Sequence, residues 1–258
     1  MGALHEGHLH LVHRATQYCL DRGWAPSVVV TVFVNPTQFN DPADFHRYPK
    51  TLEEDCAKCE AAGAACVFAP AAADIYPHGP STFRGTLPSV ATEPGLEDRL
   101  RPGHFAGVYQ VVERLFRLVQ PAAAIFGEKD WQQLQVIRAL VSDLGLPTEV
   151  VGVPTVREPD GLAMSSRNRF LSPDDRKRGL SLIRALRAAA TEPSPTHAEA
   201  AMAAELAKDG LVPEYAVVRQ AKSLQEPDPL RPAACRALIA ARVGTVRLLD
   251  NAPWPESV

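Results

Sequence analysis

The chain has 258 residues, 46% of them hydrophobic and 22% charged, a composition typical of soluble proteins with one large or two modest domains. Its 27 basic and 30 acidic side chains give a formal charge of −3 without a basic block, which argues against a nucleic-acid-binding surface. No apolar run approaches a membrane span, no signal peptide precedes the first motif, and the five cysteines are odd in number and unevenly spread. We therefore expect a cytoplasmic protein with reduced thiols and no membrane partner.

The first predicted element is a helix over residues 9–20 that follows the segment Met1–His8 without a break. Gly2 and Gly7 permit tight turns and a close approach of the backbone to a ligand. The first N–H groups of the helix are unpaired and lie at its positive end. This combination predicts a phosphate-binding site.

His5 and His8 give this segment a His-x-Gly-His pattern. The pattern resembles the nucleotide-binding signature of the nucleotidyltransferase superfamily that includes class I aminoacyl-tRNA synthetases, where the imidazoles touch the phosphates of ATP. Taken alone it is also compatible with an ordinary helix start that carries two histidines. A zinc site is a weaker alternative, because the zincin pattern needs two histidines four residues apart and these are three apart.

The next predicted element is a strand over residues 28–34, a continuous β-branched run typical of a strand buried in a parallel sheet. Asn35 and Gln38 follow its carboxyl end, where open α/β sheets bind ligands. A capping box at Thr51–Glu54 predicts a helix that ends near residue 63, followed by a short strand over residues 65–68.

Cys56 and Cys59 form a CxxC pattern within that helix. Since no second pair accompanies them, we interpret both as helix residues and not as redox or zinc ligands. Residues 70–103 are rich in Pro, Gly, Ser and Thr and lack periodicity, which indicates a functional loop or flap.

A helix over residues 105–119, a strand over 122–126, a helix over 131–144 and a strand over 148–153 complete a β-α-β-α-β order. Right-handed crossovers then predict a doubly wound, Rossmann-like parallel sheet. The polar segment Gly127–Asp130 lies at a strand-to-helix turn, as do the two motifs before it. We therefore expect the three motifs to converge on one edge of one sheet.

From residue 156 the pattern changes to that of a smaller α+β domain. Helices are predicted over residues 174–190 and 197–208, and strands over 215–219, 237–241 and 245–249. We accordingly expect two domains, residues 1–155 and residues 156–258.

Five motifs in one order resemble those of the pantothenate synthetases, ligases that join pantoate and β-alanine with ATP. The matching segments, which extend to Arg247–Asn251, are Met1–His8, Phe33–Phe39, Arg101–Phe105, Gly127–Gln133 and Met164–Asn168.

The resemblance implies a pantoyl adenylate, formed when the carboxylate of pantoate attacks the α-phosphate of ATP, and release of AMP by the amine of β-alanine. It also implies that Mg²⁺ accompanies ATP and that the assembly is a homodimer. Gln38 and Gln133 would hold pantoate, and His8 would act as the catalytic acid. The ATP site implied by the resemblance comprises Met1, Gly2, Ala3, Leu4, His5, Glu6, Gly7, His8, Gly127, Glu128, Lys129, Asp130, Val156, Met164, Ser165, Ser166 and Arg167.

The chemistry accounts for these residue types, because attack by a carboxylate on a phosphate brings two anions together. His5, His8 and Lys129 can stabilise that charge from one side. Ser165, Ser166 and Arg167 can do so from the other as a mobile lid. Asp130 can bind ribose hydroxyls or the metal.

Three departures from the family pattern carry expectations. Trp131 stands where the family has a smaller or phenolic residue, and Glu97–Asp98 replaces the usual glycine, so packing near the flap should differ. The family also has a strand ending in Pro-Thr before the first motif, and the chain begins at the methionine of that motif. We expect the sheet to lack this central strand, the chain to be unstable or weakly active, and the upstream reading frame to encode the strand. A different nucleotidyltransferase, or an inactive remnant that binds nucleotide, is the alternative function.

Overall fold

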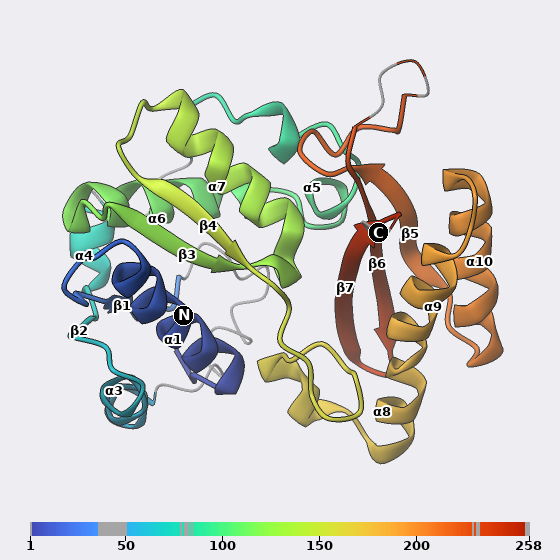
Figure 1. Ribbon diagram of the computed structural model, residues 1–258, viewed down its shortest axis with the longest axis horizontal. Helices are drawn as coiled ribbons and strands as arrows, with labels where there is room; N and C mark the ends of the chain where they lie inside the picture. Colours follow the sequence, from blue (N-terminus) through green and yellow to red (C-terminus); the bar gives the residue numbers. More distant parts are fainter. Residues whose placement is uncertain are drawn as a thin grey trace. The chain divides into compact units, whose positions relative to one another are not determined.

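The computed structural model describes residues 2–35, 51–77, 79, 83, 85–228, 230 and 233–255 (Figure 1). The chain forms two compact units. The first comprises residues 1–128 and 132–153, and the second comprises residues 129–131 and 154–258. The short segment 129–131 therefore belongs to the second unit although its neighbours in sequence belong to the first.

The first unit contains two parallel strand pairs with helices around them. Strand β1 (Val29–Thr31) pairs with β2 (Cys66–Phe68), and β3 (Ala123–Gly127) pairs with β4 (Glu149–Val153). Among the described residues no strand joins the two pairs. The helices are α1 (Glu6–Asp21), α3 (Leu52–Ala61), α4 (Ala72–Ile75), α5 (Glu97–Leu100), α6 (His104–Val119) and α7 (Trp131–Asp143), with short 3₁₀ helices η2 (Ser89–Ala91) and η3 (Glu128–Asp130).

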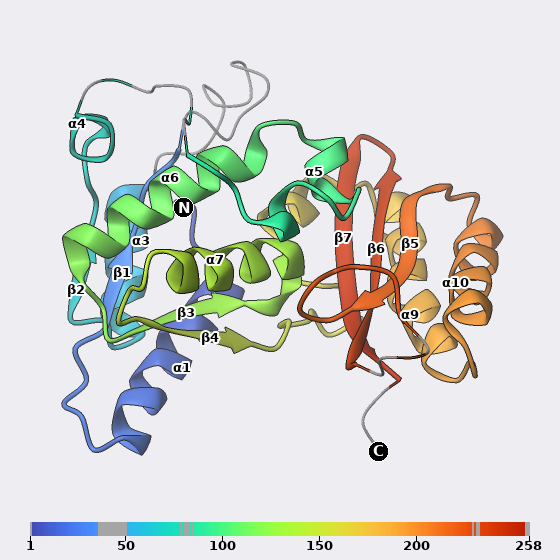
Figure 2. The same cartoon turned by 90° about the horizontal axis from the view of Figure 1, so that it is seen from above.

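Helices lie on both sides of these strands, which confirms the α/β class. Figures 1 and 2 show α7 on one side of the β3–β4 pair and α1 on the other. The apolar face of α1 packs through Val12 on Val28 and on Ala62 at the end of α3. Four α7 side chains, Leu134, Val136, Ile137 and Leu140, are at most 1% exposed and form the interior face of that helix.

The second unit is a three-stranded antiparallel sheet in the order β5-β6-β7, formed by Pro213–Gln220, Cys235–Val243 and Val246–Trp254. Helices α9 (Ser181–Ala190) and α10 (Pro195–Lys208) cover one face of this sheet (Figures 1 and 2). Their contacts with the sheet bury Leu182, Leu186, Met202, Leu206 and Ile239, all at most 2% exposed.

Several predicted boundaries are wrong in detail. Only three residues of the expected strand 28–34 form β1. Val32 donates one further hydrogen bond to the Phe68 carbonyl, and the chain leaves the sheet after it. The capping box does not form, since the Thr51 hydroxyl bonds to Asp55 instead of a backbone N–H. The segment predicted as irregular contains α4, η2 and α5.

The predicted helix 174–190 is two helices, α8 (Pro173–Gly179) and α9. Leu248 lies 3.1 Å from the position that a Cβ on Gly179 would occupy. The glycine therefore lets the chain turn close to β7, which the helical periodicity did not reveal. The strands of the second unit lie where they were expected; β5 and β6 extend further at both ends, and β7 begins one residue later and ends five residues later than predicted.

Candidate active site

The N-terminal signature loop, residues 2–8, ends in the first turn of α1. His5 is the N-cap, and its Nδ1 accepts the N–H of Gly7 at 3.1 Å. His8 completes a reciprocal cap, because its Nδ1 accepts the N–H of His5 at 3.3 Å. The two ring centroids are 4.0 Å apart.

This capping pattern selects the tautomer of both rings. A neutral imidazole carries one proton, and a nitrogen that accepts a hydrogen bond cannot carry it. Nδ1 of each ring is an acceptor, so the proton of the neutral ring lies on Nε2. The predicted phosphate-binding pair therefore consists of two Nε2–H donors held at the positive end of a helix.

Asn35 is placed at the end of β1 as predicted, and its side chain is only 3% exposed. Its Oδ1 accepts the hydroxyl proton of Tyr76 at 2.7 Å, and its Nδ2 donates to the carbonyl of Gly107 at 3.3 Å. These bonds tie the end of β1 to α4 and α6. Its role in substrate binding stays a prediction, and Gln38 and Met1 lie outside the described residues.

The two adjacent glutamines at the start of α7, Gln132 and Gln133, differ in burial. Gln132 is 4% exposed, and its side chain binds the N–H of Glu97 at 2.9 Å and the carbonyl of Val90 at 2.9 Å. Gln133, the predicted pantoate ligand, is half-buried on the same helix. Gln132 thus braces the segment 88–98, which sequence analysis did not anticipate.

Asp98, a departure from the family pattern, belongs to the same brace. Its carboxylate accepts the N–H groups of Gly95 at 3.0 Å and Leu96 at 2.8 Å, and a bond from Gln132 at 2.9 Å. The substitution therefore adds an anchor to the segment before α5.

In the second unit, one looped segment holds five of the predicted ATP ligands, Val156 and residues 164–167. Met164 donates its N–H to the carbonyl of Val156 at 2.9 Å, which brings these two predicted residues together. Ser165 is the N-cap of the 3₁₀ helix η4 (Ser166–Phe170), and its Oγ accepts the N–H of Arg167 at 3.3 Å. Asn168 closes the loop through bonds to Glu158 at 2.6 Å and the Ala163 carbonyl at 3.0 Å.

Lys129 is held by the sheet of the second unit. Its carbonyl accepts a bond from Asn251 Nδ2 at 2.8 Å, and its Nζ lies 3.3 Å from Asp130. Trp131 anchors the same segment, because its indole N–H donates to the Ala221 carbonyl at 2.7 Å. The guanidinium of Arg236 lies 3.6 Å from the centroid of that indole ring.

The predicted residues thus form local groups within each unit. The first unit holds the signature loop, Asn35, Gly127, Glu128 and Gln133, and the second holds Lys129, Asp130, Val156 and residues 164–167. One buried carboxylate that sequence analysis missed, Asp55, contacts the signature loop. The sequence contained a sign of this burial, because Asp55 lies four residues before Cys59 and therefore on the same, buried face of α3.

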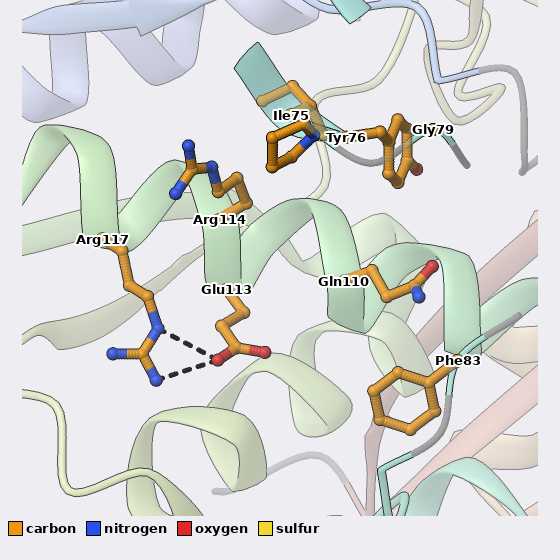
Figure 3. A pocket seen from close by; sticks show the side chains of 9 residues that line it. Ile75, Tyr76, Gly79, Phe83, Gln110, Glu113, Arg114 and Arg117 are labelled. Atoms are coloured by element: carbon orange, nitrogen blue, oxygen red, sulfur yellow. Dashed lines mark hydrogen bonds and ion pairs between the residues drawn. The ribbon is translucent and has the colours of Figure 1, made fainter. Parts of the chain in front are cut away.

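A cavity of about 300 Å³ lies in the first unit, beside α4 and α6. Figure 3 shows the side chains that line it. Within it, Arg117 is paired with Glu113 on α6. None of its lining residues is a predicted site residue: Ile75, Tyr76, Pro77, Gly79, Phe83, Gln110, Glu113, Arg114 and Arg117. The Tyr76 hydroxyl, which donates to Asn35, connects this cavity to a predicted site residue.

Within the described ranges no group of three or more His, Cys, Asp or Glu side chains is arranged to hold a metal ion. Cys56 and Cys59 lie in α3, and burial raises the pKa of the Cys59 thiol, so it stays protonated at neutral pH. In the part of the chain that the structure describes, no helix has the length and hydropathy to cross a membrane.

The family model described as pantoate-beta-alanine ligase matches residues 1–253. A pantothenate synthetase from a Nocardioides species is 48% identical over 98% of this chain and 76% of its own length. The crystal structure of the enzyme from Thermus thermophilus superposes with a TM-score of 0.86 at 45% identity, and it covers 98% of this chain and 90% of that one.

The pantoate-β-alanine ligase of Francisella tularensis, in complex with beta-gamma ATP and β-alanine, has a TM-score of 0.78 at 32% identity. That match covers 100% of this chain and 88% of the other. Fold, motif order and sequence identity agree over nearly the whole length, and the chain belongs to the pantoate-β-alanine ligase family.

Proposed function

We propose that the protein is an ATP-dependent ligase that condenses pantoate with β-alanine and releases AMP and pyrophosphate. The observation that carries the proposal is the pair of neighbouring, reciprocally capped histidines at the N-terminus of α1, within a chain that matches the ligase family from residue 1 to residue 253. The Francisella relative, in complex with beta-gamma ATP and β-alanine, supports ATP and β-alanine as substrates. The comparisons give no support to a different nucleotidyltransferase.

In the first step the carboxylate of pantoate attacks the α-phosphate of ATP and pyrophosphate leaves. Negative charge grows on the phosphate oxygens, and fixed donors lower the barrier because they need no reorganisation. We assign these donor roles to His5, His8 and Lys129, with His8 as the acid. The reciprocal cap supports this assignment, since it fixes both rings with Nε2 as the proton-bearing nitrogen.

In the second step the amine of β-alanine attacks the acyl carbon of the adenylate and AMP leaves. We propose that Gln38 and Gln133 bind the hydroxyls of pantoate and that Asn35 lies at the edge of that site. An amide offers both a donor and an acceptor without repelling the carboxylate of the substrate.

We assign residues 1–155 to nucleotide and pantoate binding and residues 156–258 to a lid that excludes water from the adenylate. The proposed ATP ligands of the first part are Met1 to His8 and Gly127 to Asp130, and those of the lid are Val156 and Met164 to Arg167. The local pairing of Val156 with Met164 supports a common role for the lid residues.

We propose that Mg²⁺ enters as the complex with ATP. Magnesium in nucleotide sites takes one or two carboxylates and completes its shell with phosphates and water. The described residues fit this pattern and not a preformed cage, because no cluster of three ligand side chains exists among them. Asp130, whose side chain is 45% exposed, is the carboxylate we assign to it. The ion would neutralise phosphate charge there.

Pyrophosphate exchange into ATP tests the proposal. We expect exchange that requires pantoate, and formation of AMP that requires both pantoate and β-alanine. Exchange supported by a phosphorylated acceptor in place of pantoate would indicate a different nucleotidyltransferase. Absence of any exchange, in a protein that binds ATP by calorimetry, would indicate an inactive remnant.

We further propose that the ligase is a homodimer and acts in the cytoplasm. The family resemblance supports the dimer, and the five free cysteines fit a reducing compartment. Sedimentation equilibrium should give about twice the mass of the chain, and a monomer mass over the whole concentration range would contradict the dimer.

A further inference from the structure

Asp55 lies outside every motif of the family pattern, yet its carboxylate reaches the signature loop. Oδ2 accepts the N–H of Ala3 at 2.9 Å, and Oδ1 accepts the N–H of Leu4 at 2.7 Å. The side chain is 0% exposed, and the Thr51 hydroxyl adds a third bond at 3.3 Å. A buried carboxyl group is costly unless hydrogen bonds satisfy it, and these three contacts supply them.

Lys58 contacts the same loop from the next turn of α3. Its Nζ donates to the carbonyl of Leu4 at 3.0 Å. Both backbone groups of Leu4 are therefore held by side chains of one helix, although more than 50 residues separate them in sequence. Ala3 has a φ of 54°, a left-handed conformation that residues other than glycine seldom adopt. The two helix side chains hold the loop in this unfavourable conformation.

The conformation of residues 3 and 4 determines where the histidines lie. His5 follows Leu4 directly and caps α1, and its own N–H is the group that His8 accepts. A rotation of the backbone at Leu4 would redirect that N–H and release the imidazole of His8. The chain of contacts thus runs from Asp55 to Leu4 and on to the two rings.

We propose that Asp55, assisted by Lys58, is a positioning residue that fixes the signature loop so that His5 and His8 present Nε2–H to the phosphates. The expected effect on the rate rests on the proposed function. The expected effect on the two imidazoles rests on the contacts alone. Asp55 touches no substrate, and its effect is transmitted through the backbone.

The variant Asp55→Asn tests the proposal. An amide has one oxygen, so it can accept only one of the two N–H groups and must turn its NH₂ toward the other. We expect kcat for pantoate-dependent exchange to fall about tenfold to a hundredfold, as small displacements of catalytic groups do. Glu54→Gln is the matched control, because it makes the same change at an exposed position one residue earlier and should leave kcat within about twofold.

A double-mutant cycle with His8 distinguishes a positioning role of Asp55 from a role in folding alone. If Asp55 acts through the histidines, Asp55→Asn in a His8→Ala background should lower the residual rate by less than about threefold. An additional loss as large as in the parent would overturn the proposal.

A readout independent of activity is the ¹⁵N spectrum of the imidazoles. In the parent, His5 and His8 should give the pattern of the Nε2–H tautomer, and in Asp55→Asn the pattern should shift toward a mixture. Parent signals of this kind without exchange activity would refute the proposed function and leave the positioning role intact. Unchanged signals and an unchanged rate in Asp55→Asn would refute the positioning role.

Should Asp55→Asn fail to fold, Lys58→Met carries the test. It removes only the bond to the Leu4 carbonyl at a half-buried position. We expect the same tautomer shift with a loss of about threefold to tenfold in kcat, about what one hydrogen bond contributes. Unchanged signals and rate would again overturn the proposal.

Discussion

The histidines of the signature loop cap the first helix, in addition to the phosphate-binding role proposed for them. Each Nδ1 accepts a backbone N–H, so a second proton on either ring would break one bond of the reciprocal cap. The cap therefore depends on Nδ1 of each ring staying an acceptor. In the proposed mechanism the positive charge near the phosphates is assigned to Lys129.

Replacement of His8 by Ala should lower the rate of adenylate formation by about two to three decades, because one preorganised donor at a transition state contributes that much. His10→Ala is the control, since His10 lies on the same helix with an exposed side chain. Pre-steady-state formation of pantoyl adenylate measures the effect. A His8→Ala rate within about threefold of the parent would exclude the assigned role.

Substitution of the two adjacent glutamines should have different effects, one on substrate affinity and the other on the free energy of unfolding. Gln133→Ala should weaken pantoate far more than ATP in isothermal titration, because Gln133 lies one helical turn past Lys129. Gln132→Ala should leave both affinities nearly unchanged and lower the free energy of unfolding by about 1–3 kcal/mol, since it leaves the Glu97 N–H without its buried acceptor. Equal losses for both substrates in Gln133→Ala would place that residue in packing.

The sequence grouped candidate site residues where they lie on one short segment, and the structure shows hydrogen bonds within two such groups, at His5 and His8 and between Met164 and Val156. The roles assigned to these residues stay predictions. Asp55 could not be grouped with the signature loop in this way, because its partners lie 51 and 52 residues away and an acid in the first turn of a helix usually only complements the dipole.

At the scale of elements, the two parallel pairs of the first unit are short for an α/β sheet. Pairing of β1 is observed only with β2 and of β3 only with β4 over the described residues. Two-stranded sheets are marginally stable, and an unpaired edge invites association with other chains. The stability of this unit consequently depends on the helices packed against the strands.

The periodicity of apolar residues predicted whether a segment is a helix or a strand, but it did not predict where each element ends. The β-branched run that predicts β1 continues to residue 34, yet Val34 and Asn35 leave the sheet because the Asn35 amide bonds to Tyr76 and Gly107. The break between α8 and α9 likewise depends on a close approach of Gly179 to Leu248. Such contacts between distant segments override local propensity.

At the scale of the whole molecule, the second unit includes a segment drawn from the middle of the first. Trp131, noted above as a departure from the family pattern, explains how this segment is held. Its ring lies under the Arg236 guanidinium, its N–H bonds to Ala221, and Asn251 secures the carbonyl of Lys129. The wider indole adds a hydrogen bond and a cation–π contact to the unit.

Trp131→Ala should lower the free energy of unfolding by about 3–5 kcal/mol, because it empties a buried aromatic site. Trp131→Phe keeps the ring and loses only the N–H bond, so we expect a loss of about 1 kcal/mol. Urea denaturation followed by circular dichroism measures both. Trp24→Ala, at a ring that is 42% exposed, serves as the surface control, and an equal effect there would contradict the argument.

The membership of residues 129–131 in the second unit constrains how such proteins can exchange parts during evolution. The chain passes between the units after Glu128, after Trp131 and after Val153, so no single crossover separates them cleanly. A recombinant joined at residue 154 would place one parent's side chain at position 131 against the other parent's residue 236. Positions 131, 236 and 251 must therefore be inherited together, and the two units behave as one heritable module.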